Sequence, residues 1–298
     1  MNYELGINFI VTYYNEHKYL DASIDSILNS INEFKKTYGS QLKCEIVISD
    51  DNSKEKQTTN VLERQKDKSK FITIIRRSEN IGVSKNRNLA ISECKNRYKY
   101  IFVLDSDDKI DENYIPELWN YILNDYDLIY SDDLILDNKG NPVGYNYRTN
   151  IYDIEFLKNP FTKANIPSCI LLKREKFEEI GGYDETNKLT NGSEFYLPES
   201  IDLVLTLIAY YSTDLKWFKI NKPHYIKTNF KNTKDRLTGK VLSFPNKSFS
   251  NIYLYKKHHK IWNEKILKKY NFKLQKPPLY DKYECLFEEP KTYKKIGF

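Results

Sequence analysis

Short apolar segments rich in β-branched residues alternate with amphipathic segments along the first half of the chain. Buried parallel strands have this composition. We predict four of them, at Ile7–Val11, Glu45–Ile48, Phe71–Ile75 and Tyr100–Leu104. Between them, an apolar stripe from Leu20 to Ile31, a polar segment over 55–67 and Val83–Ser92 indicate helices. This alternation predicts an α/β fold with a Rossmann-like, mostly parallel sheet flanked by helices, whose ligands bind beyond the carboxyl ends of the strands.

The pattern after Asp111 is mixed. It predicts a helix to about Leu123, strands at Asp127–Tyr130 and Leu134–Leu136, a turn at Asp137–Pro142, a strand at Cys169–Leu172, a short helix that ends at Gly181–Gly182, and a buried helix at Ile201–Tyr211. We expect one main domain over residues 1–235, with halves of about 1–110 and 111–235, followed by a basic helical C-terminal extension over 236–298.

The C-terminal extension carries the positive charge of the chain. Residues 251–298 hold twelve lysines against five acidic residues, whereas the rest of the chain holds 35 basic and 36 acidic groups. From 255 to 272 one apolar or aromatic stripe recurs every three or four residues: Tyr255, His259, Trp262, Ile266 and Tyr270. This predicts a basic amphipathic helix, which would either contact an anionic cytoplasmic leaflet or pack its stripe on the main domain. His258 and His259 lie among lysines, so we expect them on an exposed face.

Several classes of protein are excluded by composition. The apolar share of 40% and the charged share of 30% do not fit a disordered or fibrous chain, and no run approaches 18 apolar residues. Met1–Glu4 leads straight into the first strand without a basic segment, which argues against a secretory signal. Four scattered cysteines form no paired motif. We therefore expect a cytoplasmic protein, associated with the cytoplasmic face of a membrane if the basic helix lies on the leaflet.

Polar residues follow three of the four predicted parallel strands. They are Thr12–Glu16, Ser49–Ser53 and Asp105–Asp108. Carboxyl ends of parallel strands meet at one edge, where so many aspartates repel one another unless a cation or hydrogen-bond donors compensate. A hard divalent metal held together with a phosphate-bearing ligand explains this arrangement. Taken alone, Asp105-x-Asp107 fits an acidic surface turn and Asp50-Asp51 a solvated turn, but their positions after strands favour the metal site.

Five motifs in order carry a resemblance to a known family. They are Val11–Glu16, Ile48–Ser53, Asn80–Asn88, Leu104–Asp108 and Gly181–Glu185. With them the chain resembles family 2 glycosyltransferases of the GT-A fold over roughly residues 7–205. The resemblance implies transfer of a sugar from a nucleotide diphosphate donor, with Mn²⁺ or Mg²⁺ and with inversion at the anomeric carbon.

The resemblance also implies roles for individual residues. The residues expected to contact the nucleotide-sugar are Thr12, Tyr14, Glu16, Asp50, Asn80, Gly82, Arg87, Asp105 and Ser106. Within this set Tyr14 offers a ring face to the base, and Asp50 accepts a hydrogen bond from the uracil N3–H, which favours a UDP-sugar donor. Asp105 lies near the ribose, and Asp107 ligates the metal that bridges the two phosphates.

The general base is where the sequence departs from the family pattern. Members of the family have a Glu-Asp pair followed by x-Asp-Leu, whereas Pro198–Leu203 has Ser200 in place of the Asp of the pair. Serine cannot act as a general base at neutral pH, so Glu199, ahead of Asp202, is the candidate catalytic residue. Asp202 would alternatively cap the following helix. The sequence leaves open a displaced acid, such as Glu194 or Asp184, and an inactive site.

We therefore expect an inverting, metal-dependent transferase that moves a sugar from a UDP-sugar to a hydroxyl of a glycan or lipid-linked acceptor. Aromatic residues of the second half that would stack on sugar rings, or serve as ordinary core, are Tyr145, Tyr147, Trp217 and Phe218. His224 is a weak candidate ligand of the metal or diphosphate, and a structural role is favoured for it. The alternative functions are a non-catalytic scaffold that acts through its basic tail and a sugar transferase that acts on nucleic acid, the less favoured partner.

Overall fold

The computed structural model describes residues 3–137, 139–160, 165–166, 169–186, 190–191, 199–228, 246–277 and 280–288. The chain forms two compact units. The first consists of 1–147, 169–178 and 216–229, and the second of 148–168, 179–215 and 230–298. In the described part of the chain, no helix is both long and apolar enough to cross a membrane.

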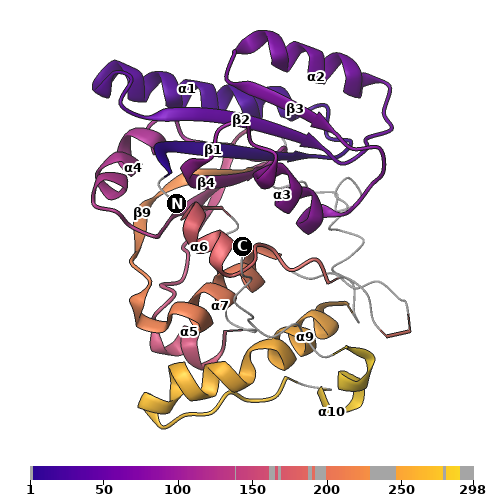
Figure 1. The fold of residues 1–298 in the computed structure, drawn as a ribbon, viewed down its shortest axis with the longest axis vertical. Coiled ribbons are helices and arrows are strands. Elements are labelled where there is room, and N and C mark those ends of the chain that lie inside the picture. Colours follow the sequence, from indigo (N-terminus) through magenta and orange to yellow (C-terminus); the bar gives the residue numbers. More distant parts are fainter. Residues whose placement is uncertain are drawn as a thin grey trace. The chain divides into compact units, whose positions relative to one another are not determined.

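A mixed sheet forms the first unit (Figure 1). Its nine strands in the described residues are β1 (Glu4–Tyr13), β2 (Lys43–Asp50), β3 (Ile72–Arg76), β4 (Tyr98–Asp105), β5 (Lys109–Ile110), β6 (Leu128–Leu136), β7 (Pro142–Asn146), β8 (Ile170–Lys173) and β9 (Trp217–Thr228). They lie in the order β3-β2-β1-β4-β8-β6-β9-β5, with β7 beside β6. The four predicted strands β1 to β4 are confirmed, and they are mutually parallel.

Helices flank this sheet, and each buries one face against it. They are α1 (Leu20–Tyr38), α2 (Gln57–Lys68), α3 (Val83–Ser92), α4 (Tyr114–Leu123) and α6 (Arg174–Glu179). The predicted stripe of α1 is buried, with Ile24 and Ile27 fully inaccessible to solvent in the core beneath β1. The polar helix α2 buries Val61 and Leu62 together with the polar residues Thr58 and Gln65. The α/β fold class predicted from the sequence is confirmed.

The prediction of two separate strands over 127–136 was wrong, because β6 continues through Ser131, Asp132 and Asp133. These polar residues are buried within the sheet. Lys219 of β9 forms an ion pair with Asp132 at 2.8 Å, and Asn146 of β7 donates to Asp133 at 3.4 Å. Partners from neighbouring strands thus satisfy side chains that, in the sequence, resemble a break between strands.

The second unit is helical in its described part. Its elements are α5 (Ile154–Lys158), α7 (Glu199–Tyr211), η1 (Ser212–Asp214), α9 (Asn246–Ile261), the π-helical turn η3 (Trp262–Leu267), η4 (Lys268–Tyr270), α10 (Tyr280–Tyr283) and η5 (Glu284–Leu286). The predicted basic helix is therefore three consecutive helical segments. Its apolar side chains Tyr255, Trp262 and Ile266 are buried, which supports packing of the stripe on protein. The expectation of an exposed His258 was wrong, since the side chain is fully buried.

Candidate active site

The carboxyl ends of β1 to β4 lie level with one another at one edge of the sheet. Thr12 of β1 is in register with Asp105 of β4. Asp50 of β2 is in register with Tyr13 on one side and with Arg76 of β3 on the other. The parallel register therefore brings the polar strand ends together at this edge, where an open α/β sheet binds its ligands.

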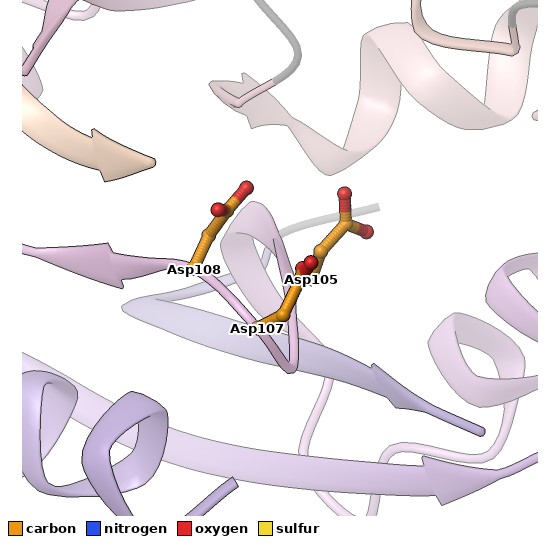
Figure 2. A group of neighbouring side chains, drawn as sticks. All are labelled: Asp105, Asp107 and Asp108. Atoms are coloured by element: carbon orange, nitrogen blue, oxygen red, sulfur yellow. The ribbon is translucent and has the colours of Figure 1, made fainter. Parts of the chain in front are cut away.

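Three carboxylates gather on the turn that follows β4 (Figure 2). One oxygen from each of Asp105, Asp107 and Asp108 lies within 4.8 Å of the others. The backbone N–H of Asp108 closes the turn by donating to the Asp105 carbonyl at 3.0 Å. Burial and the neighbouring Asp107 carboxylate raise the pKa of Asp108 to about 7. Like charges held this close therefore disfavour full ionisation of the acidic turn.

Donors from other elements hold two carboxylates of the acidic turn. Arg87 of α3, itself buried, places Nη2 2.6 Å from Oδ1 of Asp105, and the Thr12 hydroxyl lies 3.5 Å from the same oxygen. The hydroxyl of Tyr225 on β9 donates to Asp108 at 2.5 Å. Tyr225 was not assigned from the sequence. Its strand lies more than 100 residues from the turn, so no local signal links them.

The chemistry of the acidic turn fits a hard divalent cation. Mg²⁺ and Mn²⁺ prefer oxygen ligands, and the turn offers three carboxylates from one short stretch of chain. A bound cation would also relieve the repulsion that raises the pKa of Asp108. Among the residues that the structure describes, no other group of three acidic, histidine or cysteine side chains lies close enough to hold a metal ion.

Asp51 anchors the loop before α3, a role that sequence analysis missed. Its two carboxylate oxygens accept hydrogen bonds from the backbone N–H groups of Ile81 at 2.8 Å and Gly82 at 3.1 Å. The Asn80 amide donates to the Asp51 backbone carbonyl at 3.2 Å. Gly82 has a φ of +83°, which side chains disfavour, so glycine is required where the loop enters the helix. Asn80 and Gly82 are thereby tied to the end of β2.

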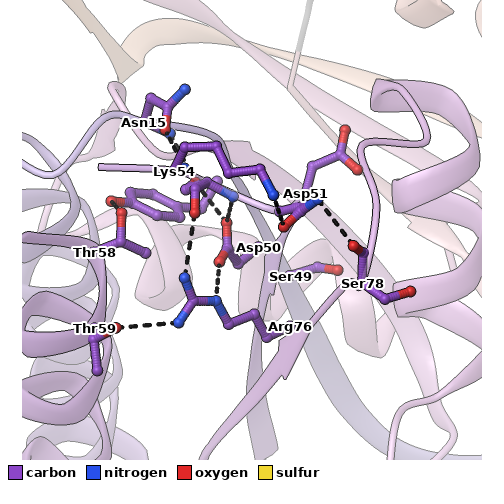
Figure 3. Close-up of polar contacts among 12 residues, drawn as sticks. Asn15, Ser49, Asp50, Asp51, Lys54, Thr58, Thr59, Arg76 and Ser78 are labelled. Carbon is purple, nitrogen blue, oxygen red and sulfur yellow. Dashed lines mark hydrogen bonds and ion pairs between the residues drawn. The ribbon is translucent and has the colours of Figure 1, made fainter. Parts of the chain in front are cut away.

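Asp50 has protein partners for both carboxylate oxygens (Figure 3). One oxygen accepts from the backbone N–H of Ser53 at 2.9 Å and from its hydroxyl at 2.6 Å. The other lies 3.0 Å from Nε of Arg76, whose guanidinium also donates to Thr59 at 3.1 Å. The Asp50 carboxylate is fully buried, whereas Arg76 is 44% exposed. The role of Asp50 as acceptor for a uracil N3–H stays a prediction. In that role the carboxylate would accept the uracil hydrogen bond in addition to those from Ser53 and Arg76, or in place of one of them.

The loop after β1 carries Tyr14 and Glu16 and is tied to its neighbours. The side-chain oxygen of Asn15 accepts from the backbone N–H of Lys54 at 3.0 Å, which joins this loop to the one after β2. Glu16 accepts a hydrogen bond from the Ser106 hydroxyl, which joins it to the acidic turn. Tyr14, which directly precedes these two residues, is partly exposed. The predicted nucleotide contacts of this loop are thus held beside the other strand ends.

The candidate bases belong to the second unit, on the first turn of α7. Glu199 and Asp202 are both buried there, at 8% and 2% exposure. Asp202 is engaged by α9: Nζ of Lys257 lies 2.7 Å from one carboxylate oxygen and Nε2 of His258 lies 2.9 Å from the other. Burial opposes the charged form of Asp202, but these two neighbours outweigh it and lower the pKa of the carboxyl. Glu194, a displaced candidate for the base, lies outside the described residues.

Asp184, the second displaced candidate, has partners of its own in this unit. Lys257 and the Tyr253 hydroxyl lie 2.6 and 2.8 Å from one of its oxygens. The pKa of Asp184 is about 2, because Lys257 and the hydrogen bonds from Thr186 outweigh the effect of burial. A carboxylate with so low a pKa and with protein partners is a weak base.

His224 and two of the four candidate stacking aromatics, Trp217 and Phe218, have structural contacts, Trp217 by stacking on Tyr130. Nε2 of His224 lies 2.8 Å from Glu117, and the ring is buried. Phe218 is stacked on Tyr121 with 4.3 Å between ring centroids. In contrast, the side chains of Tyr145 and Tyr147 on one face of the β7 segment are 53% and 73% exposed.

The sheet is mixed rather than mostly parallel as predicted, because β4–β8, β6–β8, β6–β7 and β5–β9 pair antiparallel. Four parallel strands, β1 to β4, within such a sheet with helices on its faces fit the GT-A fold of glycosyltransferases. The chain belongs to glycosyl transferase family 2, whose family model matches residues 8–181. It is a glycosyltransferase by this membership, as the resemblance implied.

Curated relatives match part of the chain. An uncharacterized glycosyltransferase of Methanocaldococcus jannaschii is 28% identical over 183 residues, which are 58% of this chain and 59% of the relative. Poly(ribitol-phosphate) β-N-acetylglucosaminyltransferase TarP of Staphylococcus aureus is 31% identical over 116 residues, 39% of this chain and 32% of TarP. Minor teichoic acid biosynthesis protein GgaA of Bacillus subtilis is 31% identical over 38% of this chain and 24% of GgaA. The match thus spans less than two thirds of each relative.

Solved structures of S. aureus TarS share the fold. TarS 1–349 has a TM-score of 0.53 at 17% identity, with 89% of this chain and 72% of that chain covered. TarS 1–349 in complex with UDP has a TM-score of 0.52, with 95% and 76% covered. At this identity the likeness establishes the architecture alone.

Proposed function

We propose that this protein transfers a sugar from a UDP-sugar to a hydroxyl group of a glycan or lipid-linked acceptor, with a divalent cation and with inversion at the anomeric carbon. The observation that carries the proposal is the acidic turn Asp105–Asp108 at the edge where the parallel strands end. Its support from relatives is the poly(ribitol-phosphate) β-N-acetylglucosaminyltransferase activity in the name of TarP, the teichoic acid biosynthesis in the name of GgaA and the UDP in one TarS structure.

In this proposal, residues of the first unit bind the donor, some through the cation and others through direct contacts. Asp105, Asp107 and Asp108 would hold Mn²⁺ or Mg²⁺, which supplies a Lewis acid that stabilises the negative charge on the departing diphosphate. Arg87 and Tyr225 keep two of these carboxylates in place through the contacts described above. The remaining donor contacts of the proposal are those of the loops after β1 and β2 and before α3, namely Thr12, Tyr14, Glu16, Asp50, Asn80, Gly82 and Ser106.

Glu199 is the proposed general base of the second unit. Removing the proton from the acceptor hydroxyl requires a carboxylate that can accept it. Asp202 is less suited, because Lys257 and His258 occupy its oxygens and lower its pKa. Ser200 at the family's base position motivates the competing proposal of a non-catalytic scaffold.

UDP release from a panel of UDP-sugars tests the function directly. We expect turnover or slow hydrolysis of at least one UDP-sugar in Mn²⁺, and loss of that activity on addition of a chelator. UDP binding without turnover of any donor would favour the scaffold. Turnover that persists in excess chelator would show that the reaction does not require a divalent cation.

The role of Asp50 predicts a change in base selectivity. We expect Asp50→Asn to weaken the preference for UDP over GDP by about 10- to 100-fold, because one hydrogen bond to a charged acceptor is worth about 1.5–3 kcal/mol. Competition binding with UDP, GDP and CDP measures it. Mn²⁺ affinity serves as the control and should stay unchanged, since Asp50 is not part of the acidic turn. Equal losses for all three nucleotides would show that Asp50 only supports the fold.

The role of Glu199 predicts a loss of turnover without a loss of donor binding. We expect Glu199→Gln to lower kcat by about 10²–10⁴-fold, the usual contribution of a general base, with UDP affinity unchanged. Asp202→Asn should lower kcat less, because the amide oxygen can still accept from one of its partners. The reverse order of these two effects would assign the base to Asp202.

Membrane contact through residues 255–272 also stays a proposal. The apolar side chains Tyr255, Trp262 and Ile266 are buried, so a contact would rest on exposed lysines such as Lys260 and Lys268. Attraction of this kind requires anionic lipid and weakens with salt. The cytoplasmic location expected from the sequence stays a proposal as well.

A further inference from the structure

A buried network of charges connects α9 to the first turn of α7 within the second unit. Lys257 of α9 contributes one ammonium to two carboxylates, at 2.6 Å from Asp184 and 2.7 Å from Asp202. His258, the next residue, reaches the second oxygen of Asp202 at 2.9 Å. The Tyr253 hydroxyl, one turn earlier on α9, donates to Asp184 at 2.8 Å. All three α9 side chains are thus directed at two acids.

This network is shielded from solvent. His258 is fully buried, Asp202 is 2% exposed, and the Lys257 side chain is 9% exposed. Burial opposes the charged form of Lys257, but the two carboxylates outweigh it and raise its pKa. Removing one partner from such a pair leaves an uncompensated buried charge, which is far costlier than losing a surface ion pair. The position of Asp202 is therefore determined by α9.

Asp202 lies three residues after Glu199, on the same turn of α7. In an α-helix, residues three apart lie on the same side, and a fixed first turn fixes the side chains that it carries. Both Lys257 and His258 contact Asp202 of this turn, and Lys257 also contacts Asp184. The two side chains of α9 thus meet at the beginning of α7.

We propose that Lys257 and His258 are positioning residues of the transfer reaction, which hold Asp202 and thereby orient the turn that carries Glu199. The inference rests on the proposed function for the role of Glu199. According to this proposal, the C-terminal extension contributes to the transfer reaction itself. A segment that only tethered the protein to a membrane, or a helix that was only exposed to solvent, would not do so. In this proposal α9 influences the reaction by holding Asp202, and Glu199 is the residue that contacts the acceptor hydroxyl.

Hydrogen exchange and steady-state kinetics on the full chain test the inference together. In Lys257→Met, we expect amide exchange over residues 203–206, whose N–H groups bond to the carbonyls of the first turn, to quicken about tenfold or more. We expect kcat to fall about tenfold or more, with the KM for the UDP-sugar and the affinity for UDP within about twofold of wild type. Lys257→Arg should restore both, because it returns the cation.

Two further variants make the result decisive. Lys273→Met alters an exposed lysine that follows η4 in the same unit, outside residues 255–272, and should change neither exchange nor kcat. His258→Phe removes one donor but leaves the Lys257 ion pairs, so it should act in the same direction with a smaller effect, and it replaces Lys257→Met if that variant does not fold.

The inference is overturned if exchange over 203–206 is unchanged in Lys257→Met and His258→Phe, or if kcat and donor affinity fall together. A wild-type protein that turns over no UDP-sugar would instead contradict the proposed function. In that case exchange still decides whether α9 fixes the first turn of α7, so the two failures are distinguishable.

Discussion

Replacing Asp107 by asparagine is expected to abolish sugar transfer and to remove the dependence of UDP binding on Mn²⁺. The substitution keeps the shape of the side chain but removes one of the three carboxylates whose oxygens lie within 4.8 Å of one another. Stabilisation of a leaving diphosphate by a cation is worth several kcal/mol, and each 1.4 kcal/mol is a factor of ten, so the loss in kcat should be about 10³-fold or more. Turnover by purified variant and wild type, with UDP titrations in Mn²⁺ and in chelator, measures it.

Asp67→Asn is the matched control for this variant. Asp67 is an exposed acid on α2 in the same unit, so its replacement changes the net charge equally without touching the acidic turn. It should leave turnover and Mn²⁺ dependence unaltered. Undiminished turnover in Asp107→Asn would remove this residue from the metal site and leave only Asp105 and Asp108 as candidate ligands.

Deleting residues 251–298 is expected to unfold the second unit. The deleted segment contains most of α9 and all of η3, which bury Ile252, Leu254, Trp262 and Leu267 almost completely. Burying a side chain of this size is worth about 1.5–3 kcal/mol, and a whole domain is stable by only about 5–15 kcal/mol. Limited proteolysis and circular dichroism of the truncated chain should show loss of the helices of this unit.

A single substitution separates this packing role from a tethering role. The Trp262 ring is fully buried and its Nε1 donates to the Leu157 carbonyl at 2.9 Å. Trp262→Ala should lower the free energy of unfolding by about 3–5 kcal/mol, measured by denaturant titration, and Trp262→Phe should lower it less. A truncated protein that stays folded and active on a soluble acceptor would instead identify the extension as a tether.

The sequence predicts the first half of the fold because local patterns there are strong. Strands β1 to β4 are nearly continuous apolar runs, as strands buried on both faces are, and α1 has a clear apolar stripe. The prediction fails at Ser131–Asp133, where residues of other strands pair with the side chains of Asp132 and Asp133. A pairing between strands nearly 90 residues apart has no signature in either segment.

In the candidate site, too, local sequence patterns predict some features, whereas contacts between distant residues could not be predicted. Parallel register follows from the strand pattern, so the meeting of Asp50 and Asp105 at one edge could be predicted. The anchoring of Gly82 by Asp51 could not, because it depends on the path of a loop. The burial of His258 could not either, because its lysine neighbours indicate solvent while its partner Asp202 lies 56 residues away.

A crystal structure with UDP and Mn²⁺, with the ion located by its anomalous scattering, tests the proposed donor site most directly. We expect one Mn²⁺ bound to Asp107 on the turn after β4, in contact with the diphosphate, and the uracil near Asp50. An ion and a nucleotide bound elsewhere, with Asp105, Asp107 and Asp108 in contact with water alone, would contradict the proposed site.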